Sequence, residues 1–95
     1  MITKNETESA ATLKEEMRTL KEGYILKYEL CKENLDDRAA YTIRVTEYID
    51  GEKVCLSAAH DITSLYETAI SLFDIIVNGL VSPVTLHDVV YDLMP

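Results

Sequence analysis

Basic residues are missing from the last 35 positions of this sequence, and glycine is scarce throughout. Residues 61–95 contain no lysine or arginine, and the chain of 95 residues has three glycines, Gly23, Gly51 and Gly79. Each glycine stands where a turn or a helix end is expected, so none is left for a loop that cradles a phosphate. P-loop, GxGxxG, GxSxG and HExxH motifs are absent as well. These absences argue against an enzyme, and we assign no catalytic, cofactor-binding or metal-binding residue.

The chain also lacks long apolar segments. No run reaches the ~18 uninterrupted apolar residues of a membrane span, and the charged stretch 1–20 is unlike a signal peptide. We expect a cytoplasmic protein with no membrane partner. Its net charge of −8 repels phosphate groups, which disfavours nucleic acid as a partner. An acidic surface that mimics nucleic acid and binds a basic protein is a separate hypothesis.

The most apolar stretch, Thr63–Asn78, predicts a helix that is buried on more than one side. With successive residues about 100° apart, its apolar side chains cover an arc of about 220°, roughly twice that of a surface helix. Ser64 and Glu67 have capping-box spacing, and Gly79 suits a left-handed helix end. We predict a central helix with a sheet on one flank and another helix or a second subunit on the other.

Alternation of apolar and polar residues predicts three strands of an antiparallel meander, at 24–32, 40–49 and 52–58. Asp50-Gly51 predicts a two-residue hairpin turn, which would pair Val45 with Leu56. A four-residue turn at 34–37 would pair Tyr28 with Ile43 in the first hairpin. The predicted inner face of the sheet comprises Tyr24, Leu26, Tyr28, Leu30, Tyr41, Ile43, Val45, Val54, Leu56 and Ala58.

Residues 3–22 have the spacing of a helix that Gly23 would end. Ala10, Leu13, Met17 and Leu20 recur at intervals of three and four, which gives a narrow apolar seam. We divide the chain into an N-terminal helix or loosely docked arm, 1–23, and a single α+β domain, 24–95. The predicted fold is thus a three-stranded antiparallel meander packed on a C-terminal helical hairpin and preceded by an N-terminal helix.

The last predicted helix follows Ser82-Pro83 and ends near Met94, because serine suits the N-cap and proline the first helical position. Its apolar side would close over the central helix. Three segments of this half resemble the C-terminal half of a family of small uncharacterised proteins of clostridia and related Firmicutes, classed as a domain of unknown function: Asp61-Ile62-Thr63, Val81-Ser82-Pro83-Val84 and Asp88-Val89-Val90-Tyr91-Asp92. The resemblance covers about residues 24–95. It implies a bacterial cytoplasmic setting and no particular chemistry.

Few residues are of types that could do chemistry. Cys31 and Cys55 are expected to be free thiols, because the outer strands of a meander lie too far apart for a disulfide. With His60 and His87 they supply the residue types of a zinc site, although their spacing matches no zinc finger or ribbon. Cys55 and His60 would be a nucleophile and a base that lack an orienting group.

Two further pairs lie one helical turn apart near the C-terminus. Asp88 and Asp92 are expected on a solvated face, where they would repel one another near the negative end of the helix dipole. His87 and Tyr91 would either frame a contact surface or pack at the boundary of the core.

Two functional hypotheses follow besides the nucleic-acid mimic. The first is a small non-catalytic interaction or regulatory module, for which a homodimer joined through the N-terminal seam is one form. A mixed outer sheet face favours it; that face comprises Ile25, Cys31, Ala40, Thr42, Tyr48, Cys55 and Ala59. The alternative is a small-molecule or metal-binding protein with a site between sheet and helices, built from His60, His87 or the cysteines.

Overall fold

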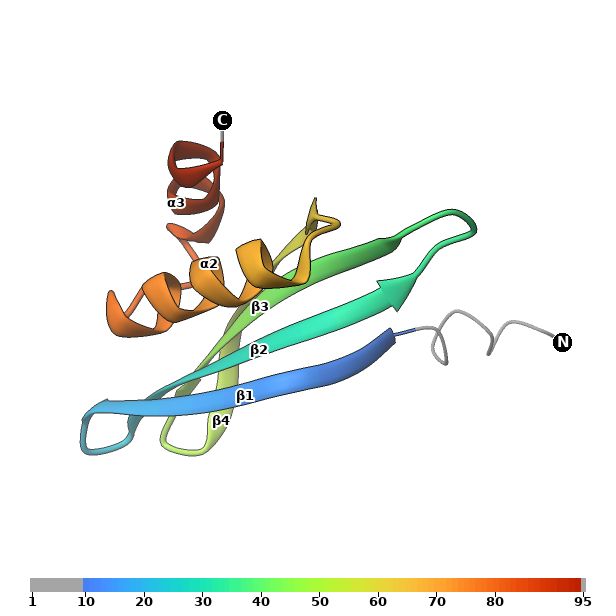
Figure 1. Cartoon of the computed structure of the whole chain (residues 1–95). Helices are drawn as coiled ribbons and strands as arrows, with labels where there is room; N and C mark the ends of the chain where they lie inside the picture. Colours follow the sequence, from blue (N-terminus) through green and yellow to red (C-terminus); the bar gives the residue numbers. More distant parts are fainter. Residues whose placement is uncertain (1–9, 95) are drawn as a thin grey trace, which may run out of the picture.

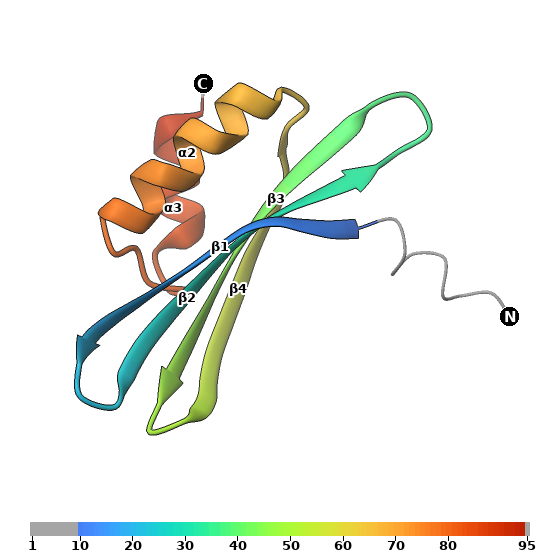
Figure 2. The same ribbon diagram turned by 60° about the horizontal axis from the view of Figure 1, so that its bottom comes forward.

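The computed structural model describes residues 10–94, which form one antiparallel sheet with two helices on one side of it (Figure 1 and Figure 2). The strands are neighbours in chain order: β1 (Ala10–Lys21), β2 (Tyr24–Asn34), β3 (Ala39–Ile49) and β4 (Glu52–Thr63). The helices are α2 (Tyr66–Asn78) and α3 (Leu86–Leu93). The chain is therefore an α+β protein. The predicted order of elements is wrong, because a fourth strand replaces the N-terminal helix.

Residues 10–21 form a strand because they pair with β2 along their whole length. Register shifts at Leu13 and Leu20 interrupt the alternation of β1, and these bulges produce the spacing of three and four residues that resembles a helix. β1 is an outer strand with both faces partly solvated, so it accommodates Lys, Glu and Arg side chains that are typical of helices. The helix start predicted at residues 3–9 lies outside the described residues.

β1 is tied to the remainder of the fold at both of its ends. Lys14 Nζ lies 3.6 Å from Asp74 Oδ1 on α2 and 5.6 Å from the centre of the Phe73 ring. At the other end the two hairpin turns meet, because the backbone N–H of Asp50 donates a hydrogen bond of 2.7 Å to the carbonyl oxygen of Gly23. Gly23 is therefore a hairpin-turn residue with φ +82°, and the prediction that it ends a helix is wrong.

The β2–β3 hairpin keeps its predicted faces but has different partners. Tyr28 lies opposite Val45 and Leu30 opposite Ile43, because the turn occupies residues 35–38. This alignment differs from the predicted one by two residues, which leaves every side chain on its predicted face. The core-facing residues of the two strands are accordingly buried: Leu26, Tyr28, Leu30, Tyr41, Ile43 and Val45.

The β3–β4 hairpin has the predicted turn, but most of β4 faces the side of the sheet opposite to the one predicted. Asp50 and Gly51 both have positive φ, as a two-residue hairpin requires. A bulge near Val54 then moves β4 by one residue, so that Val45 lies opposite Ser57 instead of Leu56. Leu56 is 48% exposed on the face away from the helices, whereas Ala59 is buried beneath them. The predicted inner face of this strand is therefore wrong.

Helix α2 packs on the sheet through one side only. Its buried residues are Ala69, Leu72, Phe73, Ile76 and Val77. As predicted, α2 contacts the sheet and a second helix, α3, which lies beside it over β4. The predicted apolar arc is nevertheless not fully buried, because Ile75 is 50% exposed. The left-handed residue at the helix end is Leu80, with φ +53°, rather than Gly79. Val81 N–H then donates to the carbonyl oxygen of Ile76 over 3.2 Å, as in a Schellman motif.

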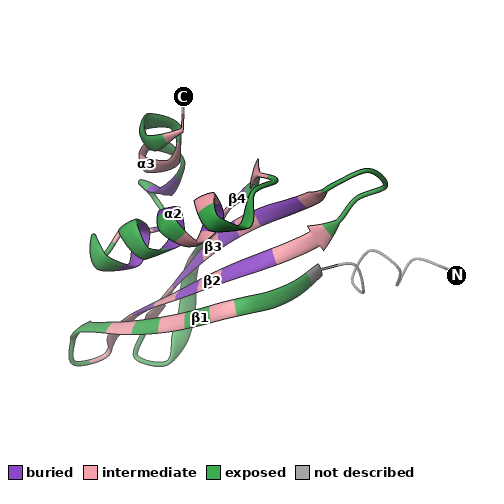
Figure 3. Ribbon diagram, in the orientation of Figure 1, coloured by how far each residue is buried: buried purple, intermediate pink, exposed green. Residues whose placement is uncertain are grey.

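On the sheet face opposite the helices, some residues of the central strands are buried by neighbouring side chains of the sheet. Figure 3 shows that buried residues concentrate along β2 and β3. Among them Cys31, Ala40 and Thr46 lie on this outer face. Arg44 crosses it, donating from Nε to Glu29 Oε1 over 2.9 Å and from Nη2 toward Cys31 Sγ at 3.7 Å. Cys55 and Ala59, which were predicted here, face the helices instead because of the β4 bulge.

Candidate binding groove

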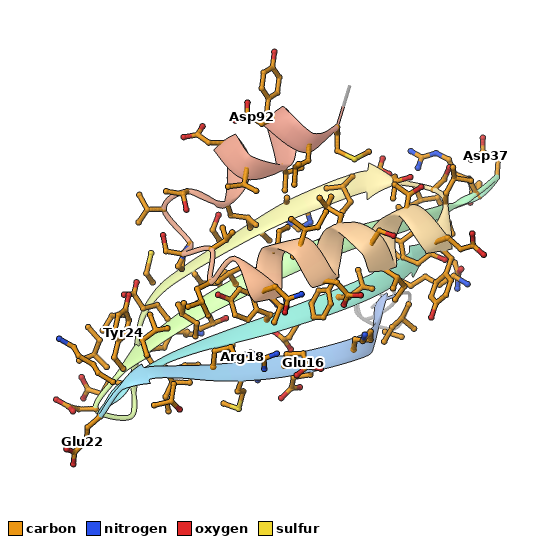
Figure 4. The ribbon with its side chains drawn as sticks, turned by 60° about the vertical axis from the view of Figure 1, so that its left-hand side comes forward. Glu16, Arg18, Glu22, Tyr24, Asp37 and Asp92 are labelled. Carbon is orange, nitrogen blue, oxygen red and sulfur yellow. The ribbon has the colours of Figure 1, made fainter. Side chains whose placement is uncertain are left out.

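A groove of about 960 Å³ runs between α3 and β4, the outer strand on the side away from β1. Figure 4 shows α3 lying along β4 at a distance from β1, with Asp92 on it. We call this the α3–β4 groove. Its lining residues come from the end of β4 and from α3: Ala58, Ala59, His60, Ile62, His87, Asp88, Val90, Tyr91, Asp92 and Met94.

The floor of the groove is apolar and continuous with the core. Ile62, Val90 and Met94 are partly buried and pack against the core cluster, and Ala59 belongs to it. Ala59 reaches this position because the bulge in β4 turns it toward the helices. The small side chain occupies little of the space under α3, so the groove stays open above it.

The rim is polar and exposed. His60, His87, Asp88 and Asp92 are all exposed, and Tyr91 is 83% exposed. The sequence singled out His60 and two pairs, Asp88 with Asp92 and His87 with Tyr91, and the structure brings all of them to one groove. Asp88 lies in the first turn of α3, where the helix dipole favours a carboxylate, so the unfavourable dipole contact predicted for it is wrong.

His87 is held at the edge of the groove by a residue that the sequence analysis missed. Ser57 Oγ lies 3.4 Å from His87 Nδ1, at the long end of a hydrogen bond. The predicted inner positions of Leu56 and Ala58 imply the outer face for Ser57, and only the β4 bulge brings it beneath α3. If the hydroxyl donates, the ring proton lies on Nε2 and is directed away from Ser57.

One carboxylate near the groove is neutralised, and two are left without an ion pair. Arg38 donates two hydrogen bonds of 2.7 Å to the two carboxylate oxygens of Asp61. This hydrogen-bonded guanidinium lowers the pKa of the Asp61 carboxyl from its ordinary value. Asp88 and Asp92 form no ion pair with any residue between 10 and 94. They therefore give the groove a negative charge.

The cysteines do not join the histidines. Cys31 is buried on the outer sheet face, 3.8 Å from Thr12 Oγ1, and Cys55 lies further along β4 opposite Glu47. Both are free thiols. Within the described part of the chain, no three His, Cys, Asp or Glu side chains are grouped closely enough to hold a metal ion. The two cysteines and two histidines that were weighed as a zinc set are thus divided between two faces of the sheet.

The fold and the groove define a class of protein: a small α+β domain with a four-stranded meander, helices on one face and an acidic, apolar-floored groove at one edge. The chain belongs to a family of unknown function, DUF6514, which matches residues 4–95. The match includes β1, which lay outside the resemblance described from the sequence. No match was found among the curated proteins or the solved structures. Residues 10–94 contain no helix that is long and apolar enough to cross a membrane.

Proposed function

We propose that this protein is a small non-catalytic interaction module that binds a basic, amphipathic segment of a partner protein in the α3–β4 groove. The observation that carries the proposal is the pairing of an apolar floor, Ile62, Val90 and Met94, with the carboxylates of Asp88 and Asp92. A segment with apolar and basic side chains would complement both. We infer from the family resemblance that the module works in a bacterial cytoplasm.

The exposed aromatic at the rim supports a protein partner. Tyrosine is enriched at protein interfaces because its ring adds apolar area while its hydroxyl remains hydrogen-bonded. Tyr91 extends from α3 with 83% of its surface exposed, beside the groove that it lines. We expect the bound segment to cover this ring, which would make Tyr91 a hot spot of the interface.

The charge distribution disfavours the nucleic-acid mimic. Such a mimic needs carboxylates gathered on one surface, whereas Glu29 lies on the outer sheet face, Asp74 on α2 and Asp88 on α3. Glu29 and Asp74 also have basic neighbours, Arg44 and Lys14. We therefore favour a local acidic groove over an extended acidic surface.

A small ligand in the same groove is the second candidate. Its volume of about 960 Å³ lies within the range of small-molecule sites, ~300–1,000 Å³, and His60 and His87 both line it. Titration with Zn²⁺ alone separates this candidate from the first. Zinc binding that disappears in both His60→Gln and His87→Gln would favour the metal-binding alternative.

The interaction hypothesis is tested with two synthetic amphipathic peptides, one of lysine and leucine and one of glutamate and leucine. We expect the lysine peptide to bind, with amide shifts in the NMR spectrum at residues 58–62 and 87–94. The double variant Asp88→Asn, Asp92→Asn should bind about twofold to thirtyfold more weakly, because each of the two exposed ion pairs contributes roughly 0.2–1 kcal/mol.

The matched control removes the same charge from other surfaces. Glu67 lies at the start of α2 and Glu52 at the start of β4, outside the groove residues. The double variant Glu52→Gln, Glu67→Gln should bind the lysine peptide nearly as the wild type does. Equal losses in the two double variants, or shifts spread over the whole sheet, would show that the peptide responds only to net charge and would overturn the proposal.

A further inference from the structure

Strand β1 presents a long edge that no other described strand covers. It is twelve residues long, and it pairs with β2 alone among the strands of residues 10–94. The outer edge of such a strand offers N–H and C=O groups to another chain. Between the bulges at Leu13 and Leu20, the stretch from Lys14 to Thr19 keeps one continuous register. It is therefore a regular strand segment that a second strand can extend.

The order of charges along this segment allows one symmetric pairing and opposes the others. Two copies of β1 related by a two-fold axis perpendicular to the sheet pair antiparallel. Because opposed residues share a face, the axis must lie between one residue and the same residue of the second copy. We name each alignment by that central residue. With the axis at Met17, Glu16 opposes Arg18 of the second copy, and Arg18 opposes its Glu16.

Every other centre from Lys14 to Arg18 places like charges opposite one another. An axis at Lys14, Glu15, Glu16 or Arg18 opposes that residue to itself, and an axis at Thr19 would need a regular register through the bulge at Leu20. Like charges directly opposite one another destabilise a strand pair. An axis at Glu15 also forms two favourable pairs, between Lys14 and Glu16, but it opposes Glu15 to itself. The alignment at Met17 is thus the centre that combines two favourable pairs with no like charges opposed.

The side chains already lie in positions that suit this alignment. Glu16 and Arg18 are on the helix-facing side of β1, where Arg18 Nη1 donates to Glu16 Oε1 over 3.1 Å (Figure 4). Met17 lies on the opposite face and is 52% exposed. Arg18 Nη1 also donates to the exposed carbonyl oxygen of Met17 over 2.9 Å. The guanidinium therefore covers the edge in the monomer and can turn to Glu16 of a second copy.

We propose that two copies of this protein associate through antiparallel pairing of their β1 strands about Met17, which would join the two sheets into one. The surface is independent of the α3–β4 groove, because β1 and β4 are at opposite edges of the sheet. The contact is a single strand flanked by two reciprocal ion pairs. We therefore expect a dimer that depends on protein concentration and weakens at high salt.

Charge reversal and its repair test the proposal. Sedimentation velocity over a concentration series should show a monomer–dimer equilibrium for the wild type. Glu16→Arg alone and Arg18→Glu alone should each abolish the dimer, because each opposes like charges at both pairs. The double swap Glu16→Arg, Arg18→Glu should restore it. An equimolar mixture of the two single variants should also associate, because each then carries the charge that the other lacks.

Hydrogen exchange locates the contact and separates it from misfolding. Amides within residues 14–19 should exchange more slowly at high wild-type concentration, and this protection should be absent in the single variants. Circular dichroism confirms that each variant is folded, and Glu52→Arg on β4 serves as a charge reversal at the opposite edge that leaves the dimer intact. A wild type that stays monomeric at every concentration, or a dimer that both single reversals leave unchanged, would overturn the proposal.

Discussion

The two helices lie on the same face of one sheet and are buried to very different extents. α2 buries five of its residues against the sheet, whereas Leu86 is the buried residue of α3. The strands beneath them explain the difference. Under α2 the sheet presents large side chains such as Tyr28 and Ile43, but under α3 it presents Ser57 and Ala59. Small residues leave space beneath α3, and that space is the groove.

This contrast assigns stability and binding to different regions. Side chains fully buried between α2 and the central strands contribute most of the apolar burial, and changes there should unfold the protein. Residues around α3 are partly exposed, so changes there should alter binding with little effect on folding. A protein can vary its binding surface freely when the two roles are separated in this way.

The largest expected effect comes from removing the central side chain of α2. Phe73 is fully buried, and its ring lies beneath Lys14. Phe73→Ala should lower the free energy of unfolding by about 3–5 kcal/mol, because it removes buried apolar area and leaves a cavity. Urea denaturation followed by circular dichroism measures this change. The matched change on α3, Val90→Ala, should lower stability by about 1 kcal/mol or less, since Val90 is only partly buried. Equal losses would remove the distinction between the two helices.

A smaller effect is expected where the sheet holds the connection between the helices. Tyr28 is fully buried, and its hydroxyl donates a hydrogen bond of 3.0 Å to the carbonyl oxygen of Val81. Tyr28→Phe should lower the free energy of unfolding by about 1–2 kcal/mol, because the carbonyl oxygen loses its partner. Urea denaturation of the two proteins at neutral pH gives the difference.

The same hydroxyl makes stability depend on pH in the alkaline range. Burial raises the pKa of Tyr28 to about 12. Because the folded protein favours the neutral phenol, the contribution of this group is complete below the ordinary tyrosine pKa near 10 and is lost as pH rises toward about 12. Tyr28→Phe should show a shallower loss of stability over that interval. Identical alkaline profiles for the two proteins would contradict this assignment.

The contact between the two hairpin turns should contribute less to the free energy of unfolding than Phe73 or the Tyr28 hydrogen bond does. Gly23 has φ +82°, and a Cβ atom there would meet the carboxylate of Asp50, whereas Gly51 has φ +86° with open space around it. Gly51→Ala should cost about 1 kcal/mol of stability through backbone strain alone, and Gly23→Ala somewhat more, because Asp50 must also move. Thermal unfolding of both variants gives the comparison. A Gly23 variant that is no less stable than the Gly51 variant would show that Asp50 moves without cost.

Local signals in the sequence were sufficient for the faces of β2 and β3 and for the Asp50-Gly51 turn, but not for the partners of β2 and β3 or for the two outer strands. The Asp50-Gly51 turn and the alternation at Leu26, Tyr28 and Leu30 depend on neighbouring residues, so they could be predicted. β1 and the inner face of β4 could not, because bulges at Leu13, Leu20 and Val54 interrupt the alternation without a distinctive residue to mark them. Each bulge depends on how its strand pairs with the neighbouring strand, and the alternation within a single strand does not record that pairing.

The groove was beyond the sequence for the same reason. His60, His87 and Asp88 could be noted individually as residue types able to bind ligands, but only the packing of α3 on β4 brings them together. Ser57 was placed on the wrong face because the prediction carried the alternation of β4 straight through the bulge.

The smallest effect concerns the ion pair that fastens the β2–β3 turn to β4, close to the end of the groove. Arg38 lowers the pKa of Asp61, so the folded state favours the carboxylate. The contribution of this pair to stability is therefore present above the ordinary carboxyl pKa and is lost as pH falls through the lowered value. An NMR titration of Asp61 should show its pKa rising toward the ordinary value in Arg38→Gln, while Lys53→Gln, a cation removed elsewhere, should leave it unchanged.

Because both partners are exposed, the Arg38→Gln variant should unfold at nearly the wild-type urea concentration at neutral pH. A large loss there would mean that this side of the sheet depends on the turn for its stability, and the contrast between a stable α2 region and an adaptable α3 region would have to be redrawn.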